Sequence, residues 1–372
     1  MPYYLDFNAT TPVHPEVLEL MIDTYKNQYG NASSRTHIFG QQAKKIVDNS
    51  RSTIAEILNL TANEIIFTSG ATESNNLSLL GMYNYGLEQQ KKHIISTVIE
   101  HASILEPLHQ LSKMGFEVEL IPVDKGGYVK AEDVIGRVRK DTLLVSVMHA
   151  NNETGIMQPV ADIGEELSKR GVFFHIDASQ TFGKLMELKN IKYDLLSITA
   201  HKIFGPQGIG ALILKSKDYK RPPLKPLIFG GGQEKGLRPG TLPVALIAGF
   251  GKAAQLAVVN HRSWMNEINK TRTDILNQLS ATNYQLNGDV SRCLSSCINV
   301  SFPGIDSEAL MLAVKESVSI SNGSACTSSE YKPSHVLEAM GMDAESSVRI
   351  SWGPQLEGID LSELINFIKA VQ

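Results

Sequence analysis

The segment from Asp194 to Gly210 carries residues whose types and spacing suggest a specific chemistry. A short apolar run, the pattern of a buried strand, turns polar at Thr199, His201 and Lys202 and is followed by a turn rich in glycine and proline. Desolvation lowers the pKa of a lysine at the end of a buried strand, and a neutral amine forms a Schiff base with an aldehyde. Pyridoxal phosphate is the common aldehyde cofactor held in this way. The alternative is an ordinary strand-end lysine that reaches solvent.

A second polar cluster follows the candidate strand 64–68. The small residues 69–72 come directly after this strand and precede a helix. A strand, a tight turn and a helix N-terminus together form an anion site, because the first amide groups of the helix have no partner within it. The amides near Ala71 and the hydroxyl of Thr72 suit a phosphate. The alternative is an ordinary helix capped by Thr72 or Ser69.

Three further strands are followed by polar residues of types that can bind a cofactor or transfer a proton. They are His101 after the strand 93–97, Asn151 and Asn152 after the strand 143–148, and the run from Asp177 to Gln180 after the strand 172–176. A lone histidine such as His101 is more often structural, so none of these clusters is specific when taken alone.

Each of these polar clusters follows a short apolar strand, and along the chain the strands alternate with helices. This alternation predicts an α/β fold with a mainly parallel sheet. All five clusters then fall at the carboxyl ends of strands, which is the edge where open α/β sheets bind ligands. Five clusters on one edge favour a binding site over five unrelated structural features.

The clusters supply what pyridoxal phosphate requires from a protein. Asp177 is the candidate partner of the protonated pyridine nitrogen, because a carboxylate stabilises that charge. Asn152 and Gln180 are candidate donors to the ring phenolate, and His101 is a candidate for stacking on the ring. The candidates for the phosphate are Ala71, Thr72, Thr199 and His201.

Two residues in the last quarter of the chain add to this set. Cys326 lies in a run of small polar residues, where a cysteine is out of place unless it reacts as a thiolate; the alternative is an incidental surface cysteine. Arg349, on a short apolar strand, suits a substrate carboxylate, and the alternative is an internal salt bridge. Cys293 and Cys297 have a spacing that is weak evidence for a metal site, and both are interpreted as structural.

Composition narrows the class of protein. The chain has 372 residues, 42% of them hydrophobic, and 35 basic against 39 acidic residues give a net charge of −4. No basic block suggests nucleic acid, and no apolar run reaches the roughly 20 residues of a membrane span. The first residues lack the pattern of a signal peptide, and three cysteines argue against a disulfide framework. A cytoplasmic protein without a metal is expected.

The length favours two domains. We predict a large cofactor-binding domain over 15–255 and a smaller α/β domain formed by 1–14 with 256–372. The smaller domain would carry Cys326 and Arg349.

The chain resembles the cysteine desulfurases of the class V aminotransferase family along nearly its whole length. The motifs that carry the resemblance are 8–12, 68–76, 100–101, 149–155, 177–180, 201–202, 238–241 and 323–326. The resemblance implies the pyridoxal-phosphate fold type I, with a seven-stranded type of sheet in the large domain. It also implies a homodimer that converts L-cysteine to alanine and passes sulfur to an acceptor protein.

Carried over residue by residue, the resemblance assigns Lys202 to the Schiff base, Asp177 to the pyridine nitrogen and His101 to ring stacking. Asn152 and Gln180 face the phenolate. The phosphate is held by Thr72, Thr199 and His201 together with Thr241 from a second subunit. Asn31 and Arg349 bind the substrate carboxylate, and Cys326 receives the sulfur as a persulfide, with Lys202 or His101 returning a proton to the product.

The sulfur acceptor is left open. Only one helix is expected after Gly353, whereas housekeeping iron–sulfur members carry a longer tail that docks the cluster scaffold; DNA phosphorothioation or tRNA thiolation is therefore favoured. Trp352 stands where a smaller or aliphatic residue is expected. The alternatives to a desulfurase are a selenocysteine lyase, an aminotransferase, which would not need Cys326, and an inactive assembly platform, which would not need Lys202 or Asp177.

Overall fold

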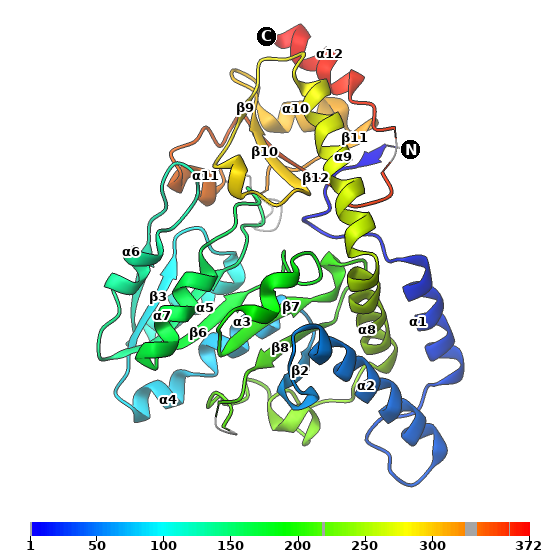
Figure 1. Cartoon of the computed structure of the whole chain (residues 1–372), viewed down its shortest axis with the longest axis vertical. Coiled ribbons are helices and arrows are strands. Elements are labelled where there is room, and N and C mark those ends of the chain that lie inside the picture. Colours follow the sequence, from blue (N-terminus) through cyan, green and yellow to red (C-terminus); the bar gives the residue numbers. More distant parts are fainter. Residues whose placement is uncertain (1, 218–219, 324–332, 357) are drawn as a thin grey trace.

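The computed structural model describes residues 2–217, 220–323, 333–356 and 358–372. Its centre is a seven-stranded sheet with the strand order β2-β8-β7-β6-β5-β3-β4 (Figure 1). β8 is antiparallel to both neighbours, and all other neighbouring pairs are parallel, which confirms the predicted, mainly parallel sheet. The strands are β2 (Ile65–Thr68), β3 (His93–Thr97), β4 (Glu117–Ile121), β5 (Thr142–Met148), β6 (Phe173–Asp177), β7 (Leu195–Thr199) and β8 (Gly210–Leu214).

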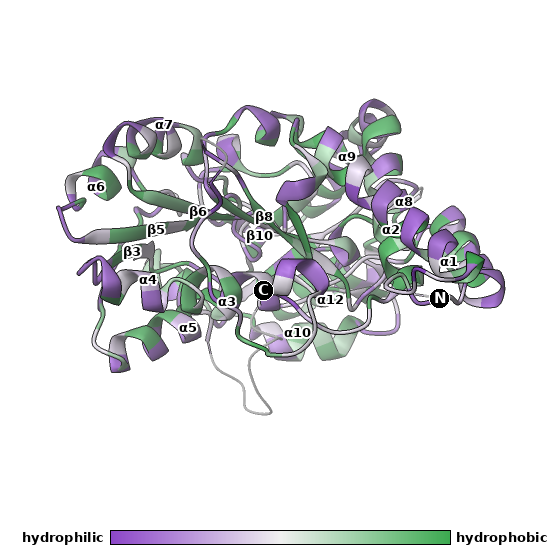
Figure 2. Cartoon of the chain, turned by 90° about the horizontal axis from the view of Figure 1, so that it is seen from below, coloured by the Kyte–Doolittle hydropathy of each residue, from purple (hydrophilic) through white to green (hydrophobic). Residues whose placement is uncertain are grey.

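Helices cover both faces of this sheet, because its central strands are apolar on both sides. Successive side chains of a strand point to opposite faces, and Leu195 and Leu196 accordingly belong to different apolar clusters. Figure 2 shows α6 (Ala131–Gly136) and α7 (Val160–Arg170) on one face. The opposite face is covered by α3 (Ala71–Leu80), α4 (Tyr83–Glu88) and α5 (Ala102–Lys113).

Three further helices lie beyond the β2 edge of the seven-stranded sheet. They are α1 (Pro15–Asn27), α2 (Ile38–Ile57) and α8 (Val244–Val259), and both α1 and α2 pack against α8 (Figure 1). The chain bends sharply at Asn260, where α8 meets α9 (His261–Leu279) at an angle of 74°. Among the described residues no single helix is long and apolar enough to cross a membrane, and only this bent pair meets the criteria of length and composition.

A second, smaller unit contains both ends of the described chain. Its sheet has the order β12-β10-β9, formed by β9 (Gln285–Leu286), β10 (Cys297–Ser301) and β12 (Ser347–Ser351), all antiparallel. β1 (Tyr3–Tyr4) pairs with β11 (Val318–Ser319). The helices are α9, α10 (Ser307–Val314), α11 (His335–Ala339) and α12 (Ser362–Val371).

This second unit has an apolar core of its own. The core contains Leu5 from the N-terminal segment, and it explains Trp352, whose buried indole donates from Nε1 to the carbonyl of Ile268 at 3.0 Å. The division into 15–255 and 1–14 with 256–372 remains our proposal, and the pairing of β1 with β11 supports it.

Candidate active site

A cavity of about 610 Å³ lies at the carboxyl edge of the large sheet. Ten of the predicted site residues line it together: Ala71, Thr72, His101, Asn152, Asp177, Gln180, Thr199, His201, Lys202 and Arg349. Asn31 and Thr241 are exposed and lie outside its lining. Cys326 lies outside the described residues.

Lys202 ends the short 3₁₀ turn Ala200–Lys202 that follows β7. Its Nζ turns into the molecule and donates to the carbonyl oxygens of Asn8 and Ala9, with a distance of 2.5 Å to the second. The alternative of a lysine that reaches solvent is therefore wrong. The amine therefore lies where residues 8 and 9 of the N-terminal segment pass the end of β7.

Asp177 is the last residue of β6, and its carboxylate is fixed on both oxygens. Oδ1 accepts from the backbone amide of Ser179 at 2.9 Å and from its hydroxyl at 2.5 Å. Oδ2 accepts from Nδ2 of the fully buried Asn75 at 2.7 Å. These three hydrogen bonds fix the orientation of the Asp177 carboxylate, which lines the cavity.

The N-terminus of α3 forms the anion-binding end of the cavity. Its N-cap is Gly70, with φ of +153° and no side-chain cap, so neither Thr72 nor Ser69 caps the helix as the alternative required. The unpaired amides at the start of a helix, together with its dipole, favour an anion there.

His201 also lines this cavity and is neutral at neutral pH. Burial lowers its pKa to about 4, with Lys202 and Lys184 adding to the effect. Its Nδ1 lies 3.2 Å from Oγ1 of Thr10, and Thr199 is buried beside it at the end of β7. A neutral imidazole and a threonine hydroxyl are both able to donate a hydrogen bond to a phosphate oxygen.

His101 has a structural role and faces the cavity as well. It is the N-cap of α5, where Nδ1 accepts from the amide of Ser103 at 3.0 Å. Burial lowers its pKa, an effect that Asp177 opposes and Lys202 and His335 strengthen. The cap leaves Nε2 as the nitrogen that carries the proton, so the neutral ring presents one donor and a flat face.

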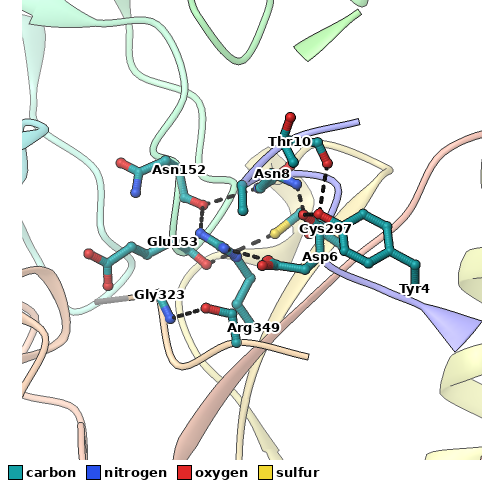
Figure 3. A network of polar contacts seen from close by, with 12 residues as sticks. Tyr4, Asp6, Asn8, Thr10, Asn152, Glu153, Cys297, Gly323 and Arg349 are labelled. Carbon is teal, nitrogen blue, oxygen red and sulfur yellow. Dashed lines mark hydrogen bonds and ion pairs between the residues drawn. The ribbon is translucent and has the colours of Figure 1, made fainter. Parts of the chain in front are cut away.

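The side chain of Gln180 and the backbone carbonyl of Asn152 both contact Asn8 in the N-terminal segment of the chain. Nε2 of Gln180 donates to the carbonyl of Asn8 at 3.0 Å. Nδ2 of Asn8 donates to the backbone carbonyl of Asn152 at 3.1 Å (Figure 3). Residues 8–10 therefore form a wall of the cavity. Residues 8–12 are one of the motifs that carry the family resemblance, but no role in the site was predicted for them from the sequence.

Arg349 on β12 combines the two roles that the sequence left open. Its Nη2 pairs with Oδ1 of Asp6 at 2.5 Å, and its Nη1 donates to the carbonyl of Asn152 at 2.9 Å (Figure 3). The internal salt bridge is thus present. The guanidinium still lines the cavity, and its buried Nε has no hydrogen-bond acceptor among the described residues.

Sequence reasoning missed a pair of supporting residues behind the site. Nδ2 of Asn75 donates both to Asp177 and to Oγ of Ser103, which lies 2.8 Å from Nδ1 of His101. One amide group therefore holds the two side chains that would contact opposite parts of a cofactor ring. Asn75 belongs to the motif 68–76, but its place inside a helix gave no sign of this contact.

The other two cysteines pack inside the protein between the two units. Burial raises the pKa of Cys293 and Cys297 alike, so both are thiols at neutral pH. Sγ of Cys293 lies 3.2 Å from the carbonyl of Thr154. Within the described ranges, no three His, Cys, Asp or Glu side chains gather as potential metal ligands.

The donor set of the cavity fits pyridoxal phosphate. An amine, a carboxylate, amide groups and a helix N-terminus without a side-chain cap surround one space, and its volume lies within the usual range for cofactor sites.

Comparison with known proteins agrees with this chemistry. The family model "Aminotransferase class-V" matches residues 3–364. A protein named "Cysteine desulfurase, mitochondrial" from Candida albicans is 44% identical over 95% of this chain and 73% of its own length. "Cysteine desulfurase IscS" from Pectobacterium atrosepticum is 42% identical over 95% of this chain and 88% of its own. The crystal structure of DndA from Streptomyces lividans matches with a TM-score of 0.83 and 40% identity, over 93% of this chain and 98% of that one.

Proposed function

This chain belongs to the class V aminotransferase family and is a cysteine desulfurase that uses pyridoxal phosphate, and from that premise we propose which of its side chains carries each step. It converts L-cysteine to alanine and passes the sulfur atom on. The observation that carries the assignment is that Lys202, Asp177 and the N-terminus of α3 surround one cavity.

Each part of the cavity would hold a different part of the cofactor. Lys202 takes the aldehyde carbon, Asp177 the ring nitrogen and His101 one face of the ring. Asn152 and Gln180 would donate to the phenolate. The phosphate would be held at the N-terminus of α3, by Ala71 and Thr72 together with Thr199 and His201, which line the same cavity. When bound, the cofactor ring withdraws electrons and stabilises negative charge on the α-carbon of the amino acid.

Lys202 is the proposed base. With pyridoxal phosphate and L-cysteine bound, Nζ of Lys202 would remove the α-proton, because this side chain lines the cavity in which both would lie. The neutral His101 carries a proton on the ring nitrogen that is not used by the α5 cap. Either side chain returns a proton to Cβ after the sulfur has left, which gives the methyl group of alanine.

Arg349 is the proposed partner of the substrate carboxylate. Its guanidinium has five donors, and Asp6 and the carbonyl of Asn152 engage two of its nitrogens. Asp6 holds the guanidinium in the wall of the cavity rather than in solvent. A substrate carboxylate in the cavity would be a third acceptor for the guanidinium, and Asn31 would complete the site if brought in by another subunit.

Cys326 is the proposed sulfur acceptor. Its thiolate forms a bond to the sulfur of cysteine as the Cβ–S bond breaks, and the electron pair of that bond remains on carbon. The described residues on either side of 324–332 are anchored close to the cavity. Oγ of Ser334 donates to Oε2 of Glu153, and a Cβ placed on Gly323 would lie 2.8 Å from the same carboxylate oxygen.

We propose a homodimer in which Thr241 completes the phosphate site of the other subunit. Thr241 is exposed in the single chain and lies outside the cavity. Large apolar side chains are also exposed on and near α1, α2 and the segment before Thr241: Tyr25, Tyr29, Ile38, Phe39 and Phe229, the last of them 85% exposed. Apolar surface of this extent is typical of an interface.

The acceptor of the persulfide sulfur is proposed to be a second protein, in iron–sulfur assembly, tRNA thiolation or DNA phosphorothioation. The cytoplasmic location stays a prediction, because one matched relative is named mitochondrial. No contact with nucleic acid or membrane is proposed.

Borohydride treatment of the holoenzyme tests the central assignment. Reduction fixes the cofactor to the amine that holds it, and peptide mass mapping then identifies the modified lysine. We expect the label on Lys202. Lys184 is the internal control, because burial lowers its pKa to about 8 and it is therefore the competing amine closest in reactivity. A label on Lys184 or on a surface lysine would refute the assignment.

A further inference from the structure

A second cavity, of about 130 Å³, lies behind Lys202 and outside the site described above. Residues 183–185 and 202–204 of the large unit form one wall, and residues 293–296 and 352–354 form the other. Both tryptophans of the chain, Trp264 and Trp352, line it together with Phe7 and Phe204. Four aromatic rings around one space make it a receptor for a flat apolar group.

One charged group in this wall has no counter-charge. Lys184 is partly buried, and its Nζ has one hydrogen-bond acceptor among the described residues, Oε1 of Gln180 at 3.4 Å. No carboxylate of the described chain forms an ion pair with it. Burial lowers its pKa to about 8, which leaves most of the amine protonated at pH 7. A buried ammonium is stabilised by an anion placed beside it.

The size of the cavity limits the occupant to one ring. An apolar protein cavity of about 150 Å³ is large enough to bind benzene. A cavity of about 130 Å³ therefore holds at most one aromatic ring, and a polar substituent has to lie at the wall beside Lys184. The uncompensated ammonium selects the substituent, because a carboxylate replaces the weak contact with Gln180 by a charge-assisted hydrogen bond.

We propose that this cavity binds a small aromatic carboxylate of the size of benzoate, with its ring among Trp264, Trp352 and Phe204 and its carboxylate on Nζ of Lys184. Of the residues that line this cavity, Lys202 is the one with a role in the proposed desulfurase reaction.

The site would be coupled to the larger cavity through shared residues. Lys202 lines both cavities, and Gln180, the acceptor for Lys184, lines the larger one. A carboxylate that draws Lys184 away from Gln180 changes the surroundings of a side chain proposed to face the cofactor. We therefore expect benzoate to alter the absorption spectrum of the holoenzyme at the same concentrations at which it binds.

Tryptophan fluorescence of the holoenzyme measures the binding directly, since both tryptophans line the cavity. Benzoate is titrated into the wild type, into Lys184→Met and into Lys189→Met, a matched change at an exposed lysine five residues away. We expect a saturable change in wild type and in Lys189→Met, with an affinity about tenfold weaker in Lys184→Met, equivalent to about 1.4 kcal/mol.

A neutral ligand of the same shape tests the role of the charge in the wild type alone, so this comparison does not depend on whether Lys184→Met folds. In the wild type, benzamide should bind at least tenfold more weakly than benzoate, because it lacks the charge that Lys184 recognises. A fluorescence change that does not saturate, equal binding of benzoate to Lys184→Met and wild type, or equal binding of benzamide and benzoate would each overturn the proposal.

Discussion

Glu100, which precedes His101, offers a test of how this protein controls charge beside the cofactor site. The side chain is fully buried, and burial raises its pKa to about 8, with a further contribution from the charge of Asp177. Oε1 accepts from the hydroxyl of Thr97 at 2.7 Å and from the amide of Met148 at 3.0 Å, while Oε2 has no partner in the described chain. A neutral Glu100 leaves Asp177 as the carboxylate available to a cofactor.

The change Glu100→Gln removes the titration and keeps the accepting oxygen. The ordinary pKa of the side chain is 4.5, so the folded protein binds this proton more tightly than the unfolded chain does. The wild type therefore loses stability as pH rises from about 4.5 to about 8, at about 1.4 kcal/mol per pH unit. At pH 7 the loss is about 3 kcal/mol, which the glutamine variant avoids.

Calorimetry of the two holoenzymes measures this difference. With an unfolding entropy that scales with chain length, about 3 kcal/mol corresponds to a rise in Tm of about 4 °C at pH 7. The rise should vanish as the pH approaches 4.5. Glu106→Gln, at an exposed position of α5, should shift Tm by less than about 1 °C at every pH. A Tm difference for Glu100→Gln that is the same at pH 5 and pH 8 would refute the reasoning.

Three further changes test the proposed site. Asn75→Ala removes the donor to the Asp177 carboxylate and should weaken cofactor binding by about tenfold or more, measured by absorbance titration of the apoenzyme; unchanged affinity would contradict a positioning role. Arg349→Lys keeps the charge but loses the planar fork, so KM for L-cysteine should rise by about tenfold, whereas an effect on kcat alone would argue against a carboxylate contact. Thr241→Ala should speed cofactor release severalfold if it reaches the partner's site, and an unchanged release rate would place it elsewhere.

Much of the site was predictable because its signals are local in sequence. Each strand of the large sheet is a short apolar run, and the residue types that follow it, such as Asp177 after β6 and Lys202 after β7, reveal the binding edge. The parallel arrangement then brings these residues together, since all the parallel strands end at one edge. The mainly parallel sheet follows from the same alternation, whereas the number of seven strands was implied by the family resemblance.

The contacts that sequence reasoning missed join residues far apart in the chain. Asp6 pairs with Arg349 across 343 positions, and the carbonyls of residues 8 and 9 receive the amine of Lys202. Local patterns carry no information on such pairs. A cap at Thr72 or Ser69, the alternative to an anion site, followed from the preference for serine and threonine at N-caps, but the N-cap is Gly70, whose positive φ favours glycine. Trp352 was unexplained until its core and its hydrogen bond to Ile268 were located.

The desulfurase reaction itself, run with a single substitution, is the most direct test of the central claim. Purified wild type and Cys326→Ser are incubated with L-cysteine, and alanine and sulfide are assayed. We predict that wild type forms both products, while Cys326→Ser keeps the yellow colour of the bound cofactor and forms neither, which separates cofactor binding from sulfur transfer. If Cys326→Ser is as active as wild type, Cys326 is not the sulfur acceptor and the proposed persulfide step is wrong.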